Sequence, residues 1–391
     1  MAWKEVKPMD EKVLFISDYL RGSYNHSQLC IRYGISRKTG YKWLDRYRAH
    51  SLAGLSEQSR RPHHSPEATA YPIRKAIIQL RKKSRMVFGS KKILALLREQ
   101  FPHQSLPSKS TIYNILKAEG LIEPRKRCQR VSRYPHALSS VQNANELWSV
   151  DYKGQFLMGN QQYCYPLTVM DHYSRYLLGC DACNGTDCKG AQTHFTKLFR
   201  EYGLPNRIRS DNGVPFATKA TGGLSALSVW WIHLGIYPER IEPGKPQQNG
   251  QHERMHRTLK KAAVVPASAS FPSQQRRFDK FKYEYNHERP HESLDQTTPA
   301  THYHVSPREY PNKLPEVEYP DYFTVKPVSS NGVLYVHNGQ VYVSNLLIGE
   351  TVGMEEIDDG VWDIYFGPVR LGGYDIWDVK GCKTPYWTIK V

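Results

Sequence analysis

The chain is poor in cysteine and has no long apolar segment. Its seven cysteines are scattered through 391 residues, an odd number without the spacing of a disulfide framework. No run approaches the roughly 18 apolar residues of a membrane-spanning helix, and the N-terminus lacks the apolar core of a secretory signal. These absences argue against a disulfide-stabilised secreted domain and a membrane protein, and they predict a protein of the reducing cytoplasm.

Acidic side chains are scarce in the first third of the chain. The protein has 54 Lys and Arg against 37 Asp and Glu, a net charge of +17. Residues 1–140 carry a net charge of +18, residues 141–320 carry +3 and residues 321–391 carry −4. A basic segment of this size predicts a polyanionic partner, most simply nucleic acid. A basic surface that only aids solubility is the alternative.

Residues 1–55 are predicted to form a small helical domain, with helices over 10–21, 26–34 and 37–50. Glycines end the first two helices, and Ser36 is suited to cap the third. The apolar side chains expected on the inner faces of these helices are Val13, Ile16, Leu20, Leu29, Ile35, Trp43, Leu44 and Tyr47.

The last two of these helices have the pattern of a helix-turn-helix, because a tight glycine turn joins them and the second is rich in Arg and Lys. In that motif the N-terminal residues of the second helix enter the major groove of DNA. The predicted DNA-binding residues are therefore Arg37, Lys38 and Lys42. An ordinary three-helix bundle with a solvated basic face is the alternative.

A second helical module is expected over residues 71–124, after a linker over residues 56–70 that is rich in Ser, Pro and basic side chains. Ser90 is suited to cap one of its helices, and Ser108 or Ser110 to cap another. The pattern predicts a second helix-turn-helix or a winged helix.

The segment 125–142 is predicted to be an extended basic linker that follows phosphates. The DNA-binding residues predicted in the second module and this linker are Lys91, Lys92, Arg125, Lys126 and Arg127.

Three carboxylates stand out in residues 143–310, where strand and helix patterns alternate. Asp151 closes an apolar strand, Asp211 closes another ahead of an Asn-Gly turn, and Glu253 lies in the first turn of a helix. Carboxylate oxygens are the ligands that Mg²⁺ prefers, and two such ions activate the attacking oxygen and stabilise the leaving oxygen of a phosphodiester. Acids at strand ends are common, so their positions alone leave a structural role open.

The helix that carries Glu253 also carries cations. Arg257 and Lys260 share its face at helical spacing, and His256 borders that face. A metal ligand beside two phosphate-binding cations is what a DNA-cutting helix would present. An exposed helix stabilised by ion pairs is the alternative.

Three motifs in this region resemble the integrase-type catalytic core of DDE transposases from bacterial insertion sequences, which are related to retroviral integrases. They are WSVDYKG at 148–154, SDNG at 210–213 and PGKPQQNGQHERMHRTLK at 243–260, followed by YN, RPH and TP elements before residue 303. The resemblance covers roughly residues 11–310. It implies an RNase H-like α/β core, with a mixed five-stranded sheet and helices on both faces.

The resemblance also implies roles for single residues. Asp151, Asp211 and Glu253 would be the catalytic ligands of two Mg²⁺ or Mn²⁺ ions, and Arg257 and Lys260 would contact DNA. The residues expected to support the active site are Asn212, Gly213 and His256.

The function implied is a DNA transposase of the bacterial, nucleoid-associated cytoplasm. It would bind the terminal inverted repeats of its element as double-stranded DNA, hydrolyse a phosphodiester at each end, and join the freed 3′-hydroxyl to target DNA. A homo-oligomer, at least a dimer, is expected because two ends must meet one target. The alternatives are a DNA-binding regulator or architectural protein with a non-catalytic core, and a general RNase H-like nuclease.

One departure from the resemblance is a long interval of 41 residues between Asp211 and Glu253. Its surplus is expected at 217–231, and the role of this segment, including a contact with DNA or a partner, is left open. A zinc site is a minor alternative for the four central cysteines, Cys164, Cys180, Cys183 and Cys188; buried free thiols are the main expectation. Asp171 is expected in a hairpin turn, without a metal role.

Residues 321–391 alternate apolar and polar side chains over five or six short runs, with Asn338-Gly339 as a hairpin turn. They predict a small β-barrel, SH3-like by analogy with integrase C-terminal domains. The net charge of −4 argues against simple phosphate binding. Contacts between protomers and a plain stabilising role are both left open.

Overall fold

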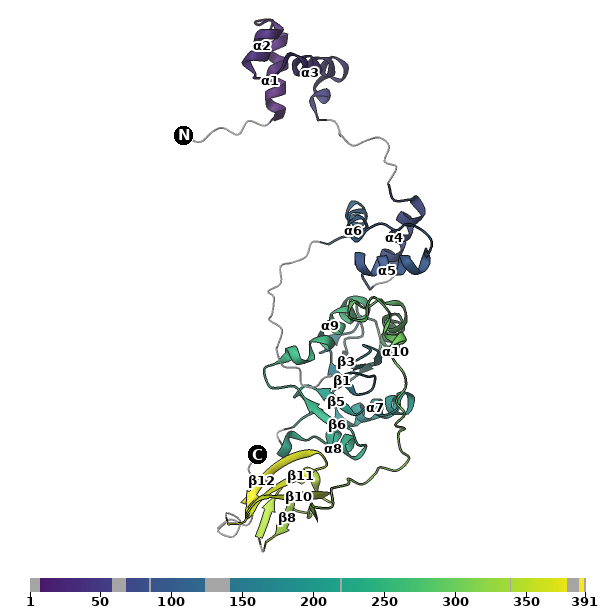
Figure 1. The fold of residues 1–391 in the computed structure, drawn as a ribbon, viewed down its shortest axis with the longest axis vertical. Coiled ribbons are helices and arrows are strands. Elements are labelled where there is room, and N and C mark those ends of the chain that lie inside the picture. Colours follow the sequence, from purple (N-terminus) through teal and green to yellow (C-terminus); the bar gives the residue numbers. More distant parts are fainter. Residues whose placement is uncertain are drawn as a thin grey trace. The chain divides into compact units, whose positions relative to one another are not determined.

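The computed structural model describes residues 8–57, 68–83, 86–123, 141–218, 220–337, 339–377 and 387–389. The chain divides into two compact units, Met1–Ala68 and Thr69–Val391 (Figure 1). Most of the predicted basic linker, including Arg125, Lys126 and Arg127, lies outside the described residues.

Over residues 8–57, the first unit contains α1 (Pro8–Leu20), α2 (His26–Arg32) and α3 (Arg37–His50), followed by a 3-10 helix over Ser51–Leu55. As predicted, Ser36 caps α3, where its hydroxyl accepts a hydrogen bond from the Thr39 amide at 3.1 Å. The core contains Phe15, Ile16, Leu29, Cys30, Trp43, Leu44 and Leu55.

The inner apolar face predicted for α1, formed by Val13, Ile16 and Leu20, is partly wrong. Phe15 and Ile16 are buried, whereas Val13 is 36% exposed and Leu20 is 62% exposed. The face of α1 that packs against α2 and α3 is centred on Phe15 and Ile16, because the aromatic ring fills more of the small core than Val13 or Leu20 would.

The second unit begins with α4 (Tyr71–Lys83), α5 (Ser90–Gln100) and α6 (Lys109–Ala118). Ser108 caps α6 as predicted, but Gly89 is the N-cap of α5 and Ser90 is already its first helical residue. Over 68–83 and 86–123, the structure contains helices and no strand, which favours a helix-turn-helix over a winged helix in this module.

A mixed sheet forms the centre of the second unit. Its strand order is β2-β3-β1-β5-β6, and β4 also pairs with β3. The strands are β1 (Leu147–Tyr152), β2 (Phe156–Leu157), β3 (Tyr163–Asp171), β4 (Leu177–Cys183), β5 (Arg207–Ser210) and β6 (Tyr237–Arg240). β3 runs antiparallel to β1 and β4, while β5 runs parallel to β1 and β6. Apart from the two-residue β2, this is the five-stranded mixed sheet that the resemblance implied.

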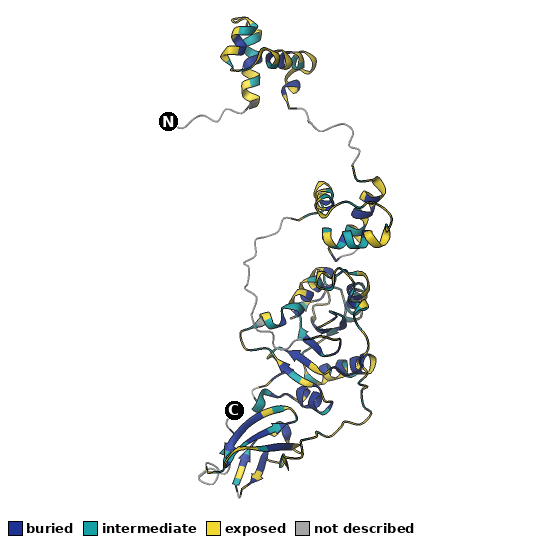
Figure 2. Cartoon of the chain, in the orientation of Figure 1, coloured by how far each residue is buried: buried dark blue, intermediate teal, exposed yellow. Residues whose placement is uncertain are grey.

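Helices cover both faces of this sheet. One face packs on α7 (Cys188–Tyr202) and α8 (Ala226–His233) through a core that includes Trp148, Phe195 and Trp231. The other packs on α9 (Gly250–Leu259) and α10 (Phe271–Tyr283). Most residues of β1, β3 and β4 are buried and drawn dark blue in Figure 2, because helices cover both faces of these strands, whereas β6 is more exposed.

The C-terminal part contains two small sheets around one core. The first, in the order β12-β11-β10-β7, is antiparallel; the second has the order β13-β9-β8. Their strands are β7 (Thr324–Pro327), β8 (Val333–Val336), β9 (Gly339–Tyr342), β10 (Thr351–Asp358), β11 (Val361–Phe366), β12 (Val369–Asp375) and β13 (Trp387–Thr388). The hairpin predicted between β8 and β9 is present, although Asn338 lies outside the described residues.

The second half of the 217–231 segment is mostly buried, whereas Thr218 is exposed and residues 220–223 are partly exposed, so a contact with DNA or a partner stays a prediction for the first half. Trp230 and Trp231 pack into the core under the central sheet, whereas Leu224, Val229 and Ile232 belong to the core of the C-terminal sheets. A helix that is apolar all round is buried on all sides. α8 therefore joins the central and C-terminal parts of the second unit.

The fold class predicted from the sequence is confirmed: a helical N-terminal region, a central mixed sheet with helices, and C-terminal antiparallel sheets. The SH3-like description of the last part remains an analogy. No helix among the described residues is long and apolar enough to cross a membrane.

Candidate active site

Asp151 and Asp211 lie side by side because the strands that carry them are parallel neighbours. The register of β1 and β5 pairs Ser149 with Arg209, an offset of sixty residues. The same offset brings Asp151, near the end of β1, level with Asp211, which directly follows β5. Paired strands lie about 4.8 Å apart, so the two acids share one edge of the sheet.

Glu253 reaches the same edge from the first turn of α9. Burial raises the pKa of Asp151 to about 7, and the charges of Asp211 and Glu253 add to the rise, while Lys153 opposes it. Three acids from distant parts of the sequence therefore act electrostatically on one another.

The three carboxylates do not surround a common point. Within the part of the chain that the structure describes, no group of three or more His, Cys, Asp and Glu side chains is placed to hold a metal ion. Glu253 is exposed and its carboxylate makes no hydrogen bond or ion pair with another described residue. It is therefore free to rotate toward the two aspartates, and the donor set is the hard oxygen set that suits Mg²⁺ or Mn²⁺.

The turn after β5 holds Asp211 in place. The Gly213 amide donates a hydrogen bond to the Asp211 carboxylate at 3.1 Å, and a Cβ on Gly213 would lie only 3.1 Å from that carboxylate. The Asn212 amide group donates to the Ile241 carbonyl at 2.8 Å, which ties the turn to the segment after β6. Both residues thus lie where the sequence-based hypothesis expects supporting groups.

A buried hydrogen-bond network fastens α9 to the sheet beside these acids, and the sequence reasoning missed most of it. The Thr168 hydroxyl of β3 lies 2.7 Å from Nε2 of both His252 and His256, and 2.9 Å from the Asp151 carbonyl. Nδ1 of His252 lies 2.9 Å from the Ser149 hydroxyl.

The geometry of this network assigns its protons. A carbonyl only accepts, so the single Thr168 proton points to the Asp151 carbonyl and both histidines donate from Nε2. Burial lowers the pKa of His252 to about 3 and that of His256 to about 2, so both rings are neutral at neutral pH. Nδ1 of His256, 3.6 Å from the Asp151 carboxylate, is then an acceptor and does not form an ion pair.

The predicted cations of the helix are exposed. Arg257 lies on the outer face of α9, and Lys260 directly follows the helix. Neighbouring Arg254 is exposed as well, and the sequence reasoning had not singled it out. These side chains lie where phosphates can reach them.

The DNA-binding residues predicted in the helical modules fall into two groups. Arg37, Lys38 and Lys42 are exposed along the N-terminal half of α3. In α5, by contrast, Lys91 forms an ion pair with Glu292, and the Lys92 amine donates to the Pro290 carbonyl. Burial, together with nearby Arg289 and Arg254, lowers the pKa of Lys92 to about 7. DNA contacts by all five remain predictions.

The central cysteines do not form a zinc site. Cys164 and Cys180 belong to the core on the α10 face of the sheet, whereas Cys183 and Cys188 pack with α7 on the opposite face. Asp171, in turn, is fully buried in its hairpin, where its carboxylate accepts hydrogen bonds from the Asn145 and Ser174 amides and from the Ser174 hydroxyl. It lies in the turn where the sequence placed it.

Comparison with known families matches this region to models described as an integrase core domain, over residues 141–246 and 234–299. A helix-turn-helix domain model matches residues 11–63, and a homeodomain-like model matches residues 39–116.

The central domain is an integrase core. The helix-turn-helix and homeodomain-like matches that accompany it indicate DNA binding.

The chain is also similar to proteins of bacterial insertion elements. It is 26% identical over 270 residues to an uncharacterized 39.2 kDa protein of insertion element IS476 from Xanthomonas euvesicatoria, covering 69% of this chain and 75% of that protein. It is 25% identical to an uncharacterized 31.7 kDa protein of IS407 from Burkholderia multivorans, covering 65% and 88%. A Gag-Pol polyprotein of Avian reticuloendotheliosis virus is 33% identical over 117 residues, 29% of this chain and 9% of the polyprotein.

Solved structures similar to the chain include retroviral integrases. The HTLV-2 integrase catalytic core domain in complex with magnesium is 14% identical, with a TM-score of 0.33, and covers 43% of this chain and 100% of that one. A chain of the simian T-cell lymphotropic virus intasome in complex with PP2A regulatory subunit B56 gamma is 12% identical, with a TM-score of 0.37, and covers 75% and 97%.

Proposed function

We propose that this integrase-core protein is a DNA transposase that cleaves and joins the ends of its own element. The helix-turn-helix domains bind the terminal inverted repeats as double-stranded DNA. The core hydrolyses one phosphodiester at each end, and the freed 3′-hydroxyl attacks target DNA in a second transfer. Because water and then the 3′-hydroxyl are the nucleophiles, no covalent bond between protein and DNA is required.

The observation that carries this proposal is the electrostatic meeting of three acids from distant segments. The pKa of Asp151 responds to the charges of both Asp211 and Glu253. Mutually repelling carboxylates at one sheet edge destabilise a fold unless a cation joins them, so their presence supports a site that is built for metal ions.

Asp151, Asp211 and Glu253 would hold two Mg²⁺ or Mn²⁺ ions, which supply charge stabilisation for the attacking and leaving oxygens of the phosphodiester. The chain's own residues position the ligands. The Gly213 amide orients Asp211. The Thr168 hydroxyl, which is hydrogen-bonded to both His252 and His256 (the Thr168 hub), fixes the helix that carries Glu253. Arg257 and Lys260 would bind phosphates beside the reacting bond.

The assembly would be at least a homodimer on DNA, because two element ends must be joined to one target. The insertion-element relatives support a bacterial host, in which the substrate DNA lies in the nucleoid.

The test replaces each acid by its neutral isostere, as Asp151→Asn, Asp211→Asn and Glu253→Gln, and measures binding, cleavage and joining on DNA that carries the element's own ends. We expect each variant to bind the ends normally and to lose cleavage and joining by at least a hundredfold. Glu309→Gln, an exposed acid elsewhere in the same unit, is the matched control. Retained cleavage in one variant would refute the role of that acid.

A second candidate is a DNA-binding regulator with a non-catalytic core, which is favoured by the incomplete convergence of the acids. End binding by the unaltered protein, without nicking in Mg²⁺ or Mn²⁺, would support it. Cleavage of unrelated DNA at a comparable rate would instead point to a general RNase H-like nuclease.

A further inference from the structure

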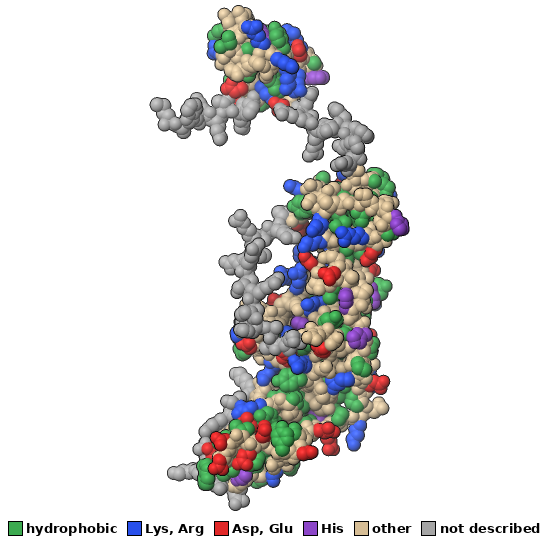
Figure 3. All heavy atoms as spheres, in the orientation of Figure 1, with side chains coloured by type: hydrophobic (Ala, Val, Ile, Leu, Met, Phe, Trp, Pro, Cys, Tyr) green, Lys and Arg blue, Asp and Glu red, His purple; other side chains and the backbone are tan. Residues whose placement is uncertain are grey.

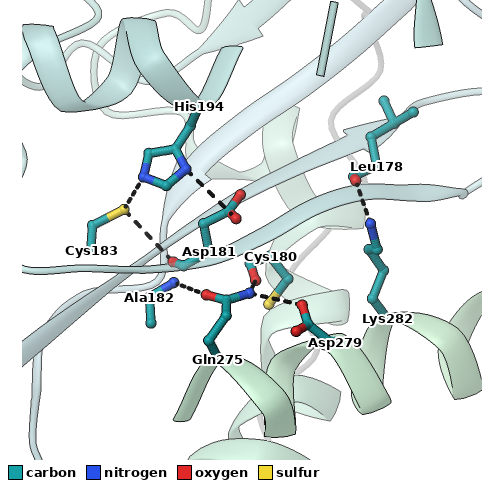
Figure 4. A network of polar contacts seen from close by, with 9 residues as sticks. All are labelled: Leu178, Cys180, Asp181, Ala182, Cys183, His194, Gln275, Asp279 and Lys282. Carbon is teal, nitrogen blue, oxygen red and sulfur yellow. Dashed lines mark hydrogen bonds and ion pairs between the residues drawn. The ribbon is translucent and has the colours of Figure 1, made fainter. Parts of the chain in front are cut away.

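A cysteine, a histidine and an aspartate meet on the α7 face of the sheet, away from the three carboxylates. Asp181 and Cys183 lie two residues apart on β4, so their side chains point to the same face. His194 comes from α7, whose start is fixed by the Asp187 side chain as N-cap. Figure 4 shows the imidazole standing between the sulfur and the carboxylate.

The distances define a chain of polar contacts. The Cys183 sulfur lies 3.4 Å from Nε2 of His194, and Nδ1 of His194 lies 3.6 Å from the Asp181 carboxylate. The Cys183 thiol also donates a hydrogen bond to the backbone carbonyl of Asp181, at a sulfur–oxygen distance of 3.8 Å. A nucleophile next to a base, with the base oriented by a third group, is the arrangement that activates thiols in proteins.

The cysteine is buried, and the other two side chains are partly exposed. Cys183 is 8% exposed and belongs to the core that faces α7, while the side chains of His194 and Asp181 are 29% and 16% exposed. The proposed reagent is therefore a small molecule. The titratable side chains that interact electrostatically with Cys183 include Tyr152 of β1 and Cys164 of β3. Neither is a base, so His194 is the group beside the sulfur that takes the thiol proton.

We propose that Cys183 is a reactive thiol that takes small oxidants such as hydrogen peroxide, with His194 and Asp181 as its activating partners. The thiolate attacks one peroxide oxygen, an S–O bond forms and the O–O bond breaks. The sulfur is oxidised by two electrons to a sulfenic acid, and the departing hydroxide takes the proton of the His194 imidazolium and leaves as water. This site shares no residue with the metal-ligand set, so it stands independently of the proposed transposase chemistry.

The buried cysteines of the same domain are internal controls. Cys164 is fully buried and Cys180 is 3% exposed, and burial raises the pKa of both thiols. The full-length protein is treated with dilute hydrogen peroxide, sulfenic acid is trapped with dimedone, and each cysteine is quantified by peptide mass spectrometry. We expect Cys183 to be modified at least tenfold faster than Cys164 and Cys180. Equal or slower modification of Cys183 would overturn the proposal.

Variants test the activating partners. His194→Gln should slow the modification of Cys183 about tenfold at neutral pH, and Asp181→Asn should slow it severalfold. Cys188→Ser, which alters a thiol that makes no hydrogen bond to His194 among the described contacts, should leave the rate unchanged. An unchanged rate in His194→Gln, with a native circular-dichroism spectrum, would contradict the proposal.

A measurement on the unaltered protein covers the case in which these variants do not fold. In that protein Cys183, Cys164 and Cys180 are compared under identical conditions. Equal modification of the three sulfurs would refute activation of Cys183 by His194.

Discussion

At the scale of single residues, Asp151 occupies an electrostatically unfavourable position. Burial and the charges of Asp211 and Glu253 raise its pKa to about 7. The folded state therefore keeps a proton that the unfolded chain loses near pH 4, and stability falls as pH rises from about 4 to about 7. An active site that needs a metal tolerates this cost because the ion removes it.

Replacing the charge should therefore stabilise the metal-free protein. We expect Asp151→Asn to raise the melting temperature in EDTA at pH 8 by a few degrees, and to have little effect at pH 4, where the wild-type carboxyl is protonated in the folded state and about half protonated in the unfolded state. Added Mg²⁺ should raise the melting temperature of the wild type more than that of the variant. Differential scanning fluorimetry measures both effects, and an equal gain at the two pH values would contradict the explanation.

His194 also makes stability depend on pH, but its charged form stabilises the fold, whereas the charged form of Asp151 destabilises it. Asp181 first, and then Cys183, raise the pKa of His194 to about 10. The folded state thus holds the imidazolium proton above the ordinary histidine pKa of about 6.5. The resulting stabilisation is fully present below about pH 6.5 and disappears as the pH rises to about 10.

We expect His194→Gln to lower the free energy of unfolding by roughly 1 kcal/mol or more at pH 6, with a gap from the wild type that closes by about pH 10. Urea unfolding at several pH values measures the gap. His103→Gln, at an exposed histidine of the second unit, is the control and should show no such trend. A gap that does not change with pH would show that the imidazole stabilises the fold by packing alone.

At the scale of elements, α9 and β4 are fixed by side chains from other segments. Thr168 binds both histidines of α9. The open edge of β4 is covered from α10, where the Gln275 side chain accepts from the Ala182 amide and donates to the Cys180 carbonyl (Figure 4). Such pairing blunts an edge strand that would otherwise offer free backbone groups to another chain.

The Thr168 hub gives a prediction with a built-in control. Thr168→Val keeps the shape but leaves two buried Nε2–H groups without an acceptor, at a cost of about 1–3 kcal/mol each. We expect this variant to lose stability and to need more Mg²⁺ for half-maximal cleavage, because α9 no longer aims Glu253. Thr168→Ser keeps the hydroxyl and should behave like the wild type. Similar metal requirements for both variants would contradict a positioning role.

At the scale of the whole molecule, charge is divided along the chain. Basic side chains are frequent on the first unit, and acidic side chains cluster on the C-terminal sheets (Figure 3). The acidic residues of that part include Glu355, Glu356, Asp358 and Asp359. This distribution assigns DNA binding to the helical modules and leaves the C-terminal part unsuited to phosphates.

Neutralising the exposed cations of α3 should weaken end binding in a salt-dependent way. For Arg37→Ala, Lys38→Ala and Lys42→Ala combined, we expect the slope of log affinity against log salt to become shallower by about 2 to 3, since each lost phosphate contact removes about 0.9. Lys189→Ala with Lys197→Ala, at exposed positions of α7, is the control. Fluorescence anisotropy across a salt series measures the slopes, and equal slopes in the two variants would place the DNA contacts elsewhere.

The sequence by itself determined much of the local structure and predicted which acids carry the chemistry. Helical spacing and Ser36 gave α3, and apolar strands with terminal acids placed Asp151 and Asp211, because these features act over a few residues. The match to an integrase core agrees with that analysis.

Tertiary structure alone decided contacts between distant segments. Nothing near Thr168 in the chain indicates that two histidines more than eighty residues away share its hydroxyl. The pairing of Cys183 with His194 and the burial of α8 between two cores depend likewise on how strands and helices pack. A local sequence pattern indicates whether a segment forms a helix or a strand. These contacts form only when apolar side chains from distant segments pack together in the folded protein.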